Sequence, residues 1–417
     1  MLDARLLRRD PDAVRAALAR RGDTSSLDRW LELDERWRAA VARFEELRSE
    51  QNAASQEIGR AKKSGDDASA AIARMQEVAA EVKRLGAERD ETEAERDRLL
   101  ASLENLPDPN APDEDTVVKH VGDATKTGRD HLELAGDRVD MERGARLSGS
   151  RFLYLRGELV FLELALVRWV LEKLRGKGFE PVIPPVLVRE QALYGTGFLP
   201  DTEQQIYHLP ADDLYLAGTS EVALASMHAG EILDASELPL RYAGFSPCFR
   251  REAGSAGRDT RGMFRVHQFD KVEMFSFVEP DKSFEEHERL LAIEEEILSD
   301  LGIPYRVVDI AIGDLGASAA RKFDCEGWLP GQGQYRELTS TSNTTDFQAR
   351  RLEIRRRSSS HPPGKPEVLH TLNGTAVAVG RTMIALLENG QREDGSVELP
   401  AVLTPYGAPA ELPAPSA

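Results

Sequence analysis

Residues 245–252 read FSPCFRRE and residues 264–275 read FRVHQFDKVEMF, and these two stretches decide the fold. Both alternate apolar and polar residues like β-strands, and the first stretch carries Arg250 and Glu252 on one face. The connecting segment Ala253–Gly262 contains three glycines and two arginines. We therefore expect two antiparallel strands joined by an arginine-rich loop, an arrangement suited to holding a bent triphosphate.

Outward from these strands, helical and strand patterns mix from Leu132 onward. We expect three longer helices, at Leu159–Arg175, at Phe284–Leu301 and near Gly380–Asn389, with short strands between them. Long insertions separate the strands, which do not alternate with helices in βαβ units. This pattern favours an α+β domain built on an antiparallel sheet.

The N-terminal quarter of the chain has a purely helical pattern. The basic segment over residues 1–26 predicts a short helix, because an Asp-Pro pair marks its start and Gly22 marks its stop. Apolar residues then recur every three or four positions over residues 37–58 and again over 72–103, on either side of a glycine-containing turn. Such stripes predict a long antiparallel α-helical coiled-coil hairpin whose arms each reach roughly 55 Å.

Polar residues interrupt the apolar stripe of this hairpin. Gln51, Arg89 and Arg96 occupy seam positions, where we expect them to weaken the contact between the arms. The periodicity by itself favours a dimerisation or scaffolding rod, and it leaves open a rod that grips a distant part of a nucleic acid. For the second interpretation the candidate phosphate contacts are the basic residues near the turn, Arg48, Arg60, Lys62 and Lys63.

The boundaries of the domains follow from breaks in these patterns. Three prolines in residues 107–112 end the hairpin, because proline cannot continue a helix. We therefore expect an N-terminal helical domain over residues 1–106, a polar linker over 107–130, the α+β domain over 131–407 and a disordered Ala/Pro-rich tail over 408–417.

The composition is typical of a soluble globular protein, with 41% hydrophobic and 30% charged residues. Because the formal charge is −18, we expect any nucleic acid to bind at local basic patches of the surface. The chain has no run of 18 apolar residues and begins with charged residues, so we expect neither a membrane span nor a signal peptide. The two cysteines, Cys248 and Cys325, favour a reducing, cytoplasmic setting.

Several common cofactor signatures are missing from the sequence. It contains neither a P-loop pattern nor G-x-G-x-x-G. The cysteines and histidines are scattered without the spacing of zinc ligands, so we expect no zinc. A chain of this kind that uses ATP must hold the phosphates with side chains and Mg²⁺.

The central stretches resemble a known family. Residues 249–252, 257–262 and 265–275 read FRRE, GRDTRG and RVHQFDKVEMF, which resembles motif 2 of the class II aminoacyl-tRNA synthetases in the form found in seryl-tRNA synthetases. Residues 178–185 resemble motif 1, whose terminal proline, Pro185 here, lies at the dimer interface in the family. The remaining similar segments follow in the family's order: the T-x-E loop at 218–221, the stretches 337–343 and 346–351, and motif 3 at 372–389.

The resemblance covers essentially the whole chain and implies a set of ATP contacts. Arg250 holds the α-phosphate, Arg265 meets the far phosphates, and Arg381 reaches the γ-phosphate. Phe269 and Arg381 sandwich the adenine ring, which Glu252 also contacts. Glu337 and Ser340 ligate Mg²⁺. The implied catalytic residues are thus Arg250, Arg265, Arg381 and Glu337, and the other implied ATP contacts are Glu252, Phe264, Val266, Phe269, Leu338 and Ser340.

The same resemblance implies a serine pocket. Thr219, Glu221 and Glu273 take the ammonium and hydroxyl groups of serine, and Arg250 also holds its carboxylate. The remaining pocket residues implied are Asn373 and Thr375. A pocket that hydrogen-bonds a hydroxyl disfavours alanine and glycine, because its buried polar groups are then left unpaired.

As an expectation, the resemblance implies a homodimeric, cytoplasmic enzyme that activates serine with ATP and Mg²⁺ and esterifies it onto tRNA(Ser). In the family the hairpin lies across the long variable arm of that tRNA. The resemblance leaves open whether tRNA(Sec) is also a substrate. One alternative is a serine-activating paralogue in resistance or biosynthesis. Another is a coiled-coil binding protein built on an inactive synthetase core, which is expected to have lost some of Arg250, Glu252, Glu337 or Arg381; all four are present.

Overall fold

The computed structural model describes residues 1–22, 24–65, 67–200, 205–253, 262–357 and 364–415. The chain divides into two compact units, one formed by Leu2–Leu103 and the other by Met1 together with Glu104–Ala417. Each unit has its own packing. None of the helices in the described part of the chain is long and apolar enough to cross a membrane.

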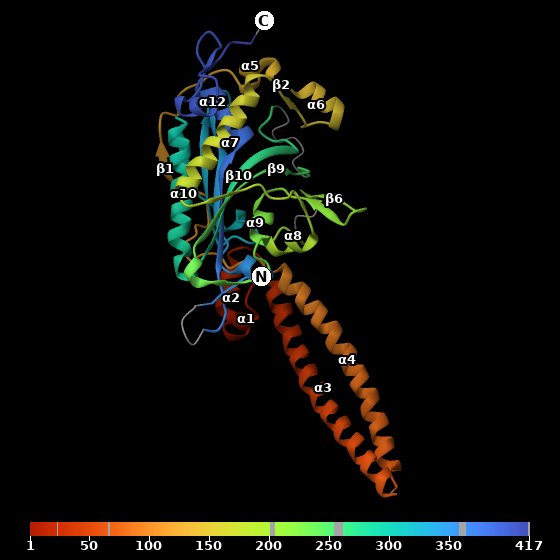
Figure 1. The fold of residues 1–417 in the computed structure, drawn as a ribbon. Coiled ribbons are helices and arrows are strands. Elements are labelled where there is room, and N and C mark those ends of the chain that lie inside the picture. Colours follow the sequence, from red (N-terminus) through yellow and green to blue (C-terminus); the bar gives the residue numbers. More distant parts are fainter. Residues whose placement is uncertain (23, 66, 201–204, 254–261, 358–363, 416–417) are drawn as a thin grey trace. The chain divides into compact units, whose positions relative to one another are not determined.

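The N-terminal unit is the expected helical hairpin (Figure 1). Asp10 caps its second helix, and the left-handed Gly65, at φ 78°, ends the first long arm. At the base of the hairpin the side chains of Leu27 and Trp30 are fully buried. Its helices are α1 (Ala4–Arg9), α2 (Pro11–Ala19) and the two arms, α3 (Ser25–Ser64) and α4 (Ser69–Ser102).

Two arginines at the seam between the arms stack on aromatic rings. The guanidinium carbon of Arg96 lies 4.0 Å from the centre of the Trp37 ring, and that of Arg89 lies 4.6 Å from the Phe44 ring. Such cation–π contacts contribute about 0.5–2 kcal/mol each. The two arginines that we expected to weaken the seam thus have aromatic partners on α3, which offset part of that weakening.

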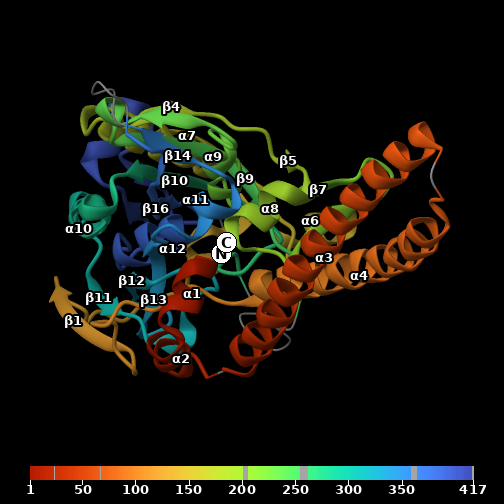
Figure 2. The same cartoon turned by 90° about the horizontal axis from the view of Figure 1, so that it is seen from below.

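The second unit is built on a mostly antiparallel sheet, which confirms the α+β expectation (Figures 1 and 2). All neighbouring strands of this sheet are antiparallel except its edge strand β4, which runs parallel to β9. In spatial order the eight strands are β1 (Thr116–Val121), β11 (Tyr305–Asp309), β12 (Arg321–Leu329), β13 (Gln334–Asn343), β16 (His370–Ala378), β10 (Gln268–Val278), β9 (Leu240–Phe249) and β4 (Glu180–Val182).

Three helices cover one face of this sheet (Figure 1). They are α7 (Glu158–Gly176), α10 (Ser283–Asp300) and α12 (Val379–Asn389), and each of them confirms a helix expected from the sequence. Their apolar sides join the sheet in one core; Leu166 and Ile297, for example, are fully buried there. The opposite face carries a second apolar cluster, which includes Phe275 and Phe277 of β10, and beside it a group of polar side chains.

Two segments differ from the sequence prediction. The expected linker contains strand β1, which pairs with β11 at the edge of the sheet (Figure 2). Backbone hydrogen bonds hold this strand while Val118 stays 53% exposed, so no buried apolar face marked it in the sequence. The expected disordered tail forms β18 (Glu411–Leu412), which pairs with β17 (Val397–Glu398) and buries Leu412 completely. Leu412, together with the buried Ala408, anchors that segment despite its Ala/Pro-rich composition.

Candidate active site

A cavity of about 530 Å³ lies in the second unit, on the side of the sheet away from α7, α10 and α12. Every residue that the sequence predicted to contact ATP or serine borders it. These residues are supplied by β10, β13 and β16, by the loops that flank β9 and β10, and by the starts of α9 (Glu221–Ser226) and α12. Residues far apart in the chain thus share one concave site.

Strand β10 contributes three alternate side chains to the floor of the cavity. Phe269, Lys271 and Glu273 point to the same face because side chains in a strand alternate. The Lys271 ammonium donates a hydrogen bond of 2.8 Å to Thr219 Oγ1 and forms an ion pair with Glu273. Sequence reasoning missed Lys271, although its position between Phe269 and Glu273 on the same face was visible in the sequence.

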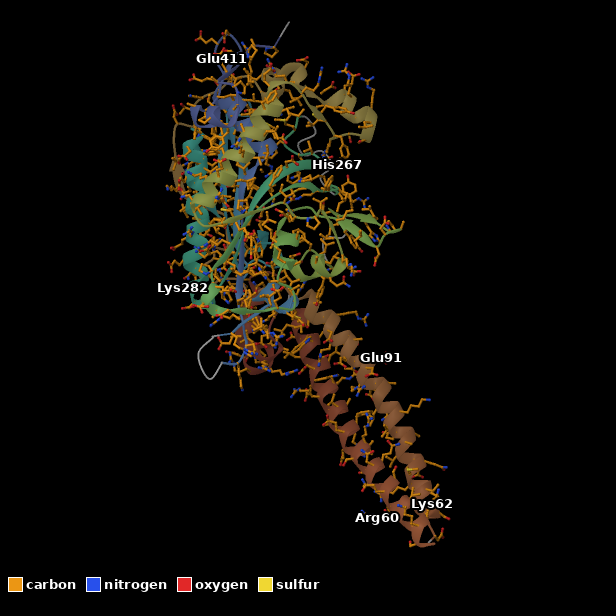
Figure 3. The ribbon with its side chains drawn as sticks, viewed as in Figure 1. Arg60, Lys62, Glu91, His267, Lys282 and Glu411 are labelled. Atoms are coloured by element: carbon orange, nitrogen blue, oxygen red, sulfur yellow. The ribbon has the colours of Figure 1, made fainter. Side chains whose placement is uncertain are left out.

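The two expected strands are shorter than predicted at the ends nearest the cavity. Strand β9 ends at Phe249, and β10 begins at Gln268. Between them, Arg250 N donates to His267 O at 3.0 Å, and His267 Nδ1 lies 2.9 Å from Arg250 O (His267 is labelled in Figure 3). Glu252 has the left-handed φ of 50°, so the strand cannot continue through it.

This break in the strand changes where Glu252 points. If strand β9 continued, Arg250 and Glu252 would point to the same face, because they are two residues apart. Instead, the turned backbone brings Glu252 against Arg265, with which it forms an ion pair. Arg250 Nε donates to Gly218 O at 3.2 Å, and its guanidinium lies 5.4 Å from the Phe269 ring. The two arginines of the connecting loop, Arg258 and Arg261, lie outside the described residues.

A β-bulge brings Glu337 and Ser340 to the same face of β13. Residues three apart in a regular strand point to opposite faces. Here Glu326 pairs with Glu337 while its neighbour Cys325 pairs with Thr339, so Leu338 is the extra residue. The side chain of Leu338 joins the hydrophobic core, and Glu337 and Ser340 both border the cavity.

Arg381, at the start of α12, faces this bulge. Its Nη1 donates to Glu337 O at 3.0 Å and lies 3.3 Å from Glu337 Oε1. Enclosure by the cavity walls disfavours the charged form of Glu337, but Arg381, Lys322 and Arg250 outweigh it and hold the pKa of this carboxyl below its usual range. The carboxylate is therefore ionised and suited to a cation.

Two aromatic rings lie beside these arginines. Arg381 stacks on Phe264 at 4.6 Å, and Arg336 covers the same ring at 3.9 Å. Phe264 and Val266 are largely buried, so only part of each faces the cavity. Phe269, the other expected ring, lies under Arg250.

The serine pocket expected from the sequence centres on a buried carboxyl. Glu221 is 8% exposed, and its Oε1 accepts hydrogen bonds from Asn373 Nδ2 at 2.8 Å and from Gln348 Nε2 at 2.7 Å. Burial raises the pKa of Glu221 to about 7, and the charge of Glu273 adds to the rise, while Gln348 and nearby positive charges oppose it. Thr375 Oγ1 lies 3.5 Å from Glu273 Oε2.

A second cation missed by sequence reasoning is Lys322 on β12. It borders the cavity, and its Nζ lies 2.9 Å from Asp324 Oδ1. Its position next to Glu337 and Arg381 results from strand pairing, which the local sequence does not show. Within the described residues, no three His, Cys, Asp or Glu side chains are grouped so that they could hold a metal ion. Cys248 and Cys325 are both buried as free thiols.

The basic residues predicted to meet nucleic acid lie in the N-terminal unit. Arg48 is exposed on α3, with its guanidinium 5.8 Å from the Phe44 ring. Arg60, Lys62 and Lys63 are exposed near the turn between the arms, where Figure 3 shows Arg60 and Lys62. They are separated in the chain from the cavity residues and belong to a different compact unit.

Comparison with known proteins matches both units. The family model "Seryl-tRNA synthetase N-terminal domain" matches residues 1–107, and the model "tRNA synthetase class II core domain (G, H, P, S and T)" matches residues 207–390. A relative described as serine–tRNA ligase from Thermobifida fusca is 53% identical over 416 residues, covering 97% of each chain.

Solved structures agree with these matches. The seryl-tRNA synthetase from Pyrococcus horikoshii complexed with ATP has a TM-score of 0.93 and 41% identity, covering 100% of both chains. The cytoplasmic serine–tRNA ligase from Naegleria fowleri in complex with AMP has a TM-score of 0.86 and 33% identity, covering 100% of this chain and 99% of the other. Because relatives this similar extend along nearly its whole length, the chain belongs to the seryl-tRNA synthetase family.

Proposed function

We propose that this chain is a serine–tRNA ligase that joins L-serine to the 3′ end of tRNA(Ser) with ATP. The observation that carries the proposal is the single cavity that gathers all the expected ATP and serine residues. The relatives solved with ATP and AMP support nucleotide binding by this chain, for which we propose this cavity. The domain division proposed is an arm domain over residues 1–106 and a catalytic domain that includes β1 of the expected linker and β18 of the expected tail.

The proposed reaction has two steps, and neither needs a protein nucleophile. A carboxylate oxygen of serine attacks the α-phosphorus of ATP, the bond from that phosphorus to the bridging oxygen breaks, and pyrophosphate leaves with the bond's electron pair. A ribose hydroxyl of the terminal adenosine of tRNA then attacks the carbonyl carbon of seryl-adenylate. The hydroxyl proton is lost and AMP leaves. Catalysis comes from alignment and from charge stabilisation.

The arginines supply the charge stabilisation in this scheme. Arg250 contacts the α-phosphate and the serine carboxylate, Arg265 the outer phosphates, and Arg381 the γ-phosphate. Glu252 and Phe269 contact adenine, which Arg381 covers on its other face. The remaining contacts proposed along the nucleotide are Phe264, Val266 and Leu338.

The bulge on β13 fits a Mg²⁺ ion that accompanies ATP. Glu337 is ionised and shares a face with the Ser340 hydroxyl, and both are oxygen donors of the kind Mg²⁺ prefers. When bound, the ion neutralises phosphate charge. Arg381 holds Glu337 in place by a hydrogen bond of 3.0 Å to its backbone carbonyl and an ion pair of 3.3 Å with its carboxylate.

The serine pocket recognises a small amino acid by its polar groups. Glu221 and Glu273 attract the ammonium group, Thr219 and Thr375 offer hydroxyls, and Asn373 closes the pocket. Lys271 donates a hydrogen bond to Thr219 and pairs with Glu273, so it fixes the positions of these two side chains relative to each other. Threonine is excluded by crowding, and alanine by the loss of hydrogen bonds.

The pH dependence of serine use is expected to follow Glu221. Below its pKa of about 7 the carboxyl is neutral and attracts ammonium weakly; above it the carboxylate is charged. The kcat/KM for serine in pyrophosphate exchange is therefore expected to rise about tenfold from pH 6 to pH 8. The rise is expected to vanish in Glu221→Gln. A flat profile in the unmodified protein, or a rise that persists in this variant, contradicts the assignment.

The homodimer is proposed on an exposed apolar surface of the second unit. On α7, Phe161 is 60% and Leu164 is 59% exposed, and Ile183, two residues before Pro185, is 80% exposed. Phe161 and Leu164 are three residues apart on one helix and so lie side by side, and large apolar side chains exposed together mark an association surface. The proposed partner is a second copy of the chain.

Phe161→Glu is expected to weaken dimerisation at least about 100-fold, because a charge would be buried at the interface. Sedimentation equilibrium measures the effect. Phe284→Glu is the matched control, since Phe284 is 53% exposed on α10, and it is expected to leave association unchanged. A dimer of undiminished strength in Phe161→Glu rules out this surface.

The experiment that tests the proposed function follows radiolabelled serine in the presence of ATP and total tRNA, with an acyl carrier protein as the parallel acceptor. Label on tRNA, and none on the carrier, is expected. Threonine, alanine and cysteine serve as competing amino acids, and each is expected to be activated more slowly than serine. Serine-dependent pyrophosphate exchange with no label on tRNA would favour a serine-activating paralogue instead.

A further inference from the structure

Gln348 stands directly behind the serine pocket. It lies on α11 (Phe347–Arg351) with its side chain fully buried, and it is not among the described residues that line the cavity. Its Nε2 nevertheless donates a hydrogen bond of 2.7 Å to Glu221 Oε1. Gln348 therefore reaches the cavity through the residues that it bonds, of which Glu221 presents a charged group there.

The surroundings of the Gln348 amide allow only one orientation. Its Oε1 accepts from Thr371 Oγ1 at 2.9 Å, and Thr344 Oγ1 lies 3.3 Å away. Its Nε2 faces two acceptors, the Glu221 carboxylate and Thr196 O at 3.2 Å. A flipped amide would set its oxygen against both acceptors, so the network fixes the donor towards Glu221.

This contact determines which oxygen of Glu221 meets the cavity. Within the part of the chain that the structure describes, the side-chain hydrogen bonds from Gln348 and Asn373 both reach Oε1. Oε2 is the oxygen left for a ligand. Two amide donors to one oxygen restrain rotation of the Glu221 carboxylate about its Cγ–Cδ bond. A single donor would restrain this rotation less.

The neutral charge of the Gln348 side chain is also significant. Glu221 shares the pocket with a second buried carboxylate, Glu273, which is already paired with Lys271. A lysine or arginine in place of Gln348 would neutralise Glu221 and weaken its attraction for a substrate ammonium group. A glutamate would add like charge. An amide holds the carboxylate while leaving its negative charge available.

We propose that Gln348 is a positioning residue of the serine pocket, which holds the Glu221 carboxylate with Oε2 towards the amino acid. The proposal rests on the proposed function of the cavity. Because this contact acts equally in ground and transition states, its loss raises the KM for serine and leaves kcat and the KM for ATP nearly unchanged.

The test is Gln348→Glu, which keeps the size of the side chain and its acceptor for Thr371 but replaces the donor to Glu221 by a group of like charge. Pyrophosphate exchange is expected to show a KM for serine raised at least tenfold, a KM for ATP within twofold and a kcat within threefold of the unmodified protein. Gln391→Glu is the matched control, because Gln391 Nε2 donates to Glu388 O at 2.8 Å away from the cavity. Both KM values are expected to stay unchanged in it.

Thr371→Val provides a second test of the same proposal if Gln348→Glu does not fold. It removes the hydroxyl that orients the amide at almost constant volume, and a two- to fivefold rise in the KM for serine alone is expected. An unchanged KM for serine in a folded variant overturns the proposal, as does an equal rise of both KM values, which indicates a general structural role. If the unmodified protein shows no serine-dependent exchange, the proposed function fails rather than this inference.

Discussion

Replacing Arg381 by alanine is expected to lower serine-dependent pyrophosphate exchange about 1,000-fold, which corresponds to about 4 kcal/mol of lost transition-state stabilisation. The side chain stacks on Phe264 and holds Glu337 through the contacts at 3.0 and 3.3 Å, so its removal takes away a proposed phosphate contact and loosens a proposed Mg²⁺ ligand together. Arg250→Ala is expected to have an effect of similar size, because its guanidinium is the proposed contact of both substrates of the first step.

The matched control for these variants is Arg392→Ala. Arg392 is 46% exposed and pairs with Glu398 and Glu411 on the surface (Glu411 is labelled in Figure 3). Its loss is expected to leave exchange unchanged. Circular dichroism and thermal unfolding establish that Arg250→Ala and Arg381→Ala remain folded. Exchange at the unmodified rate in either folded variant refutes its phosphate role.

Shortening the hairpin is expected to separate the two steps of the reaction. Phe44 lies next to Gly86 and Ser55 next to Met75, a register that places residue 50 opposite residue 80. Removing residues 51–79 and closing the gap with a short Gly-Ser turn therefore preserves the pairing at the base. Serine-dependent exchange is expected to stay within twofold, while aminoacylation of tRNA(Ser) falls at least about 100-fold, since the exposed basic residues near the turn are lost.

Both activities are measured on the same preparation, so exchange serves as the internal control for folding of the catalytic unit. A second control replaces only Arg60, Lys62 and Lys63 by alanine, which leaves the helices intact. A smaller loss of aminoacylation, with a weaker dependence on salt, is expected. Equal loss of exchange and aminoacylation in the shortened protein would contradict a tRNA-binding arm.

The long helices and the hairpin were predictable because their signals are local. Apolar residues repeat with helical spacing over many turns in α3 and α4, and an Asp-Pro pair and Gly65 mark where helices begin and end. Helices α7, α10 and α12 were found by the same reasoning. Strand β1 was missed, because an edge strand held by backbone hydrogen bonds carries no strong side-chain pattern.

The residue types of the site were predictable as well, since the family motifs are short contiguous stretches. Their geometry was not. The left-handed turn at Glu252 and the bulge at Leu338 are backbone features that no residue type requires, yet they set Glu252 against Arg265 and bring Glu337 and Ser340 to one face. Lys271 and Lys322 contact the other cavity residues only because the fold brings distant segments of the chain beside them, which the local sequence does not show.

Local patterns in the chain were thus sufficient for the helical arm and the antiparallel class of the sheet, and the family resemblance supplied the identities of the predicted residues that line the cavity. The hydrogen-bonded interior of the serine pocket required the folded molecule. Thr196, Glu221, Gln348 and Asn373 come from four separate elements, and the bond from Gln348 to Glu221 joins residues 127 positions apart. A hydrogen bond depends on distance and angle between atoms, and long-range packing alone sets these for residues so far apart in the chain.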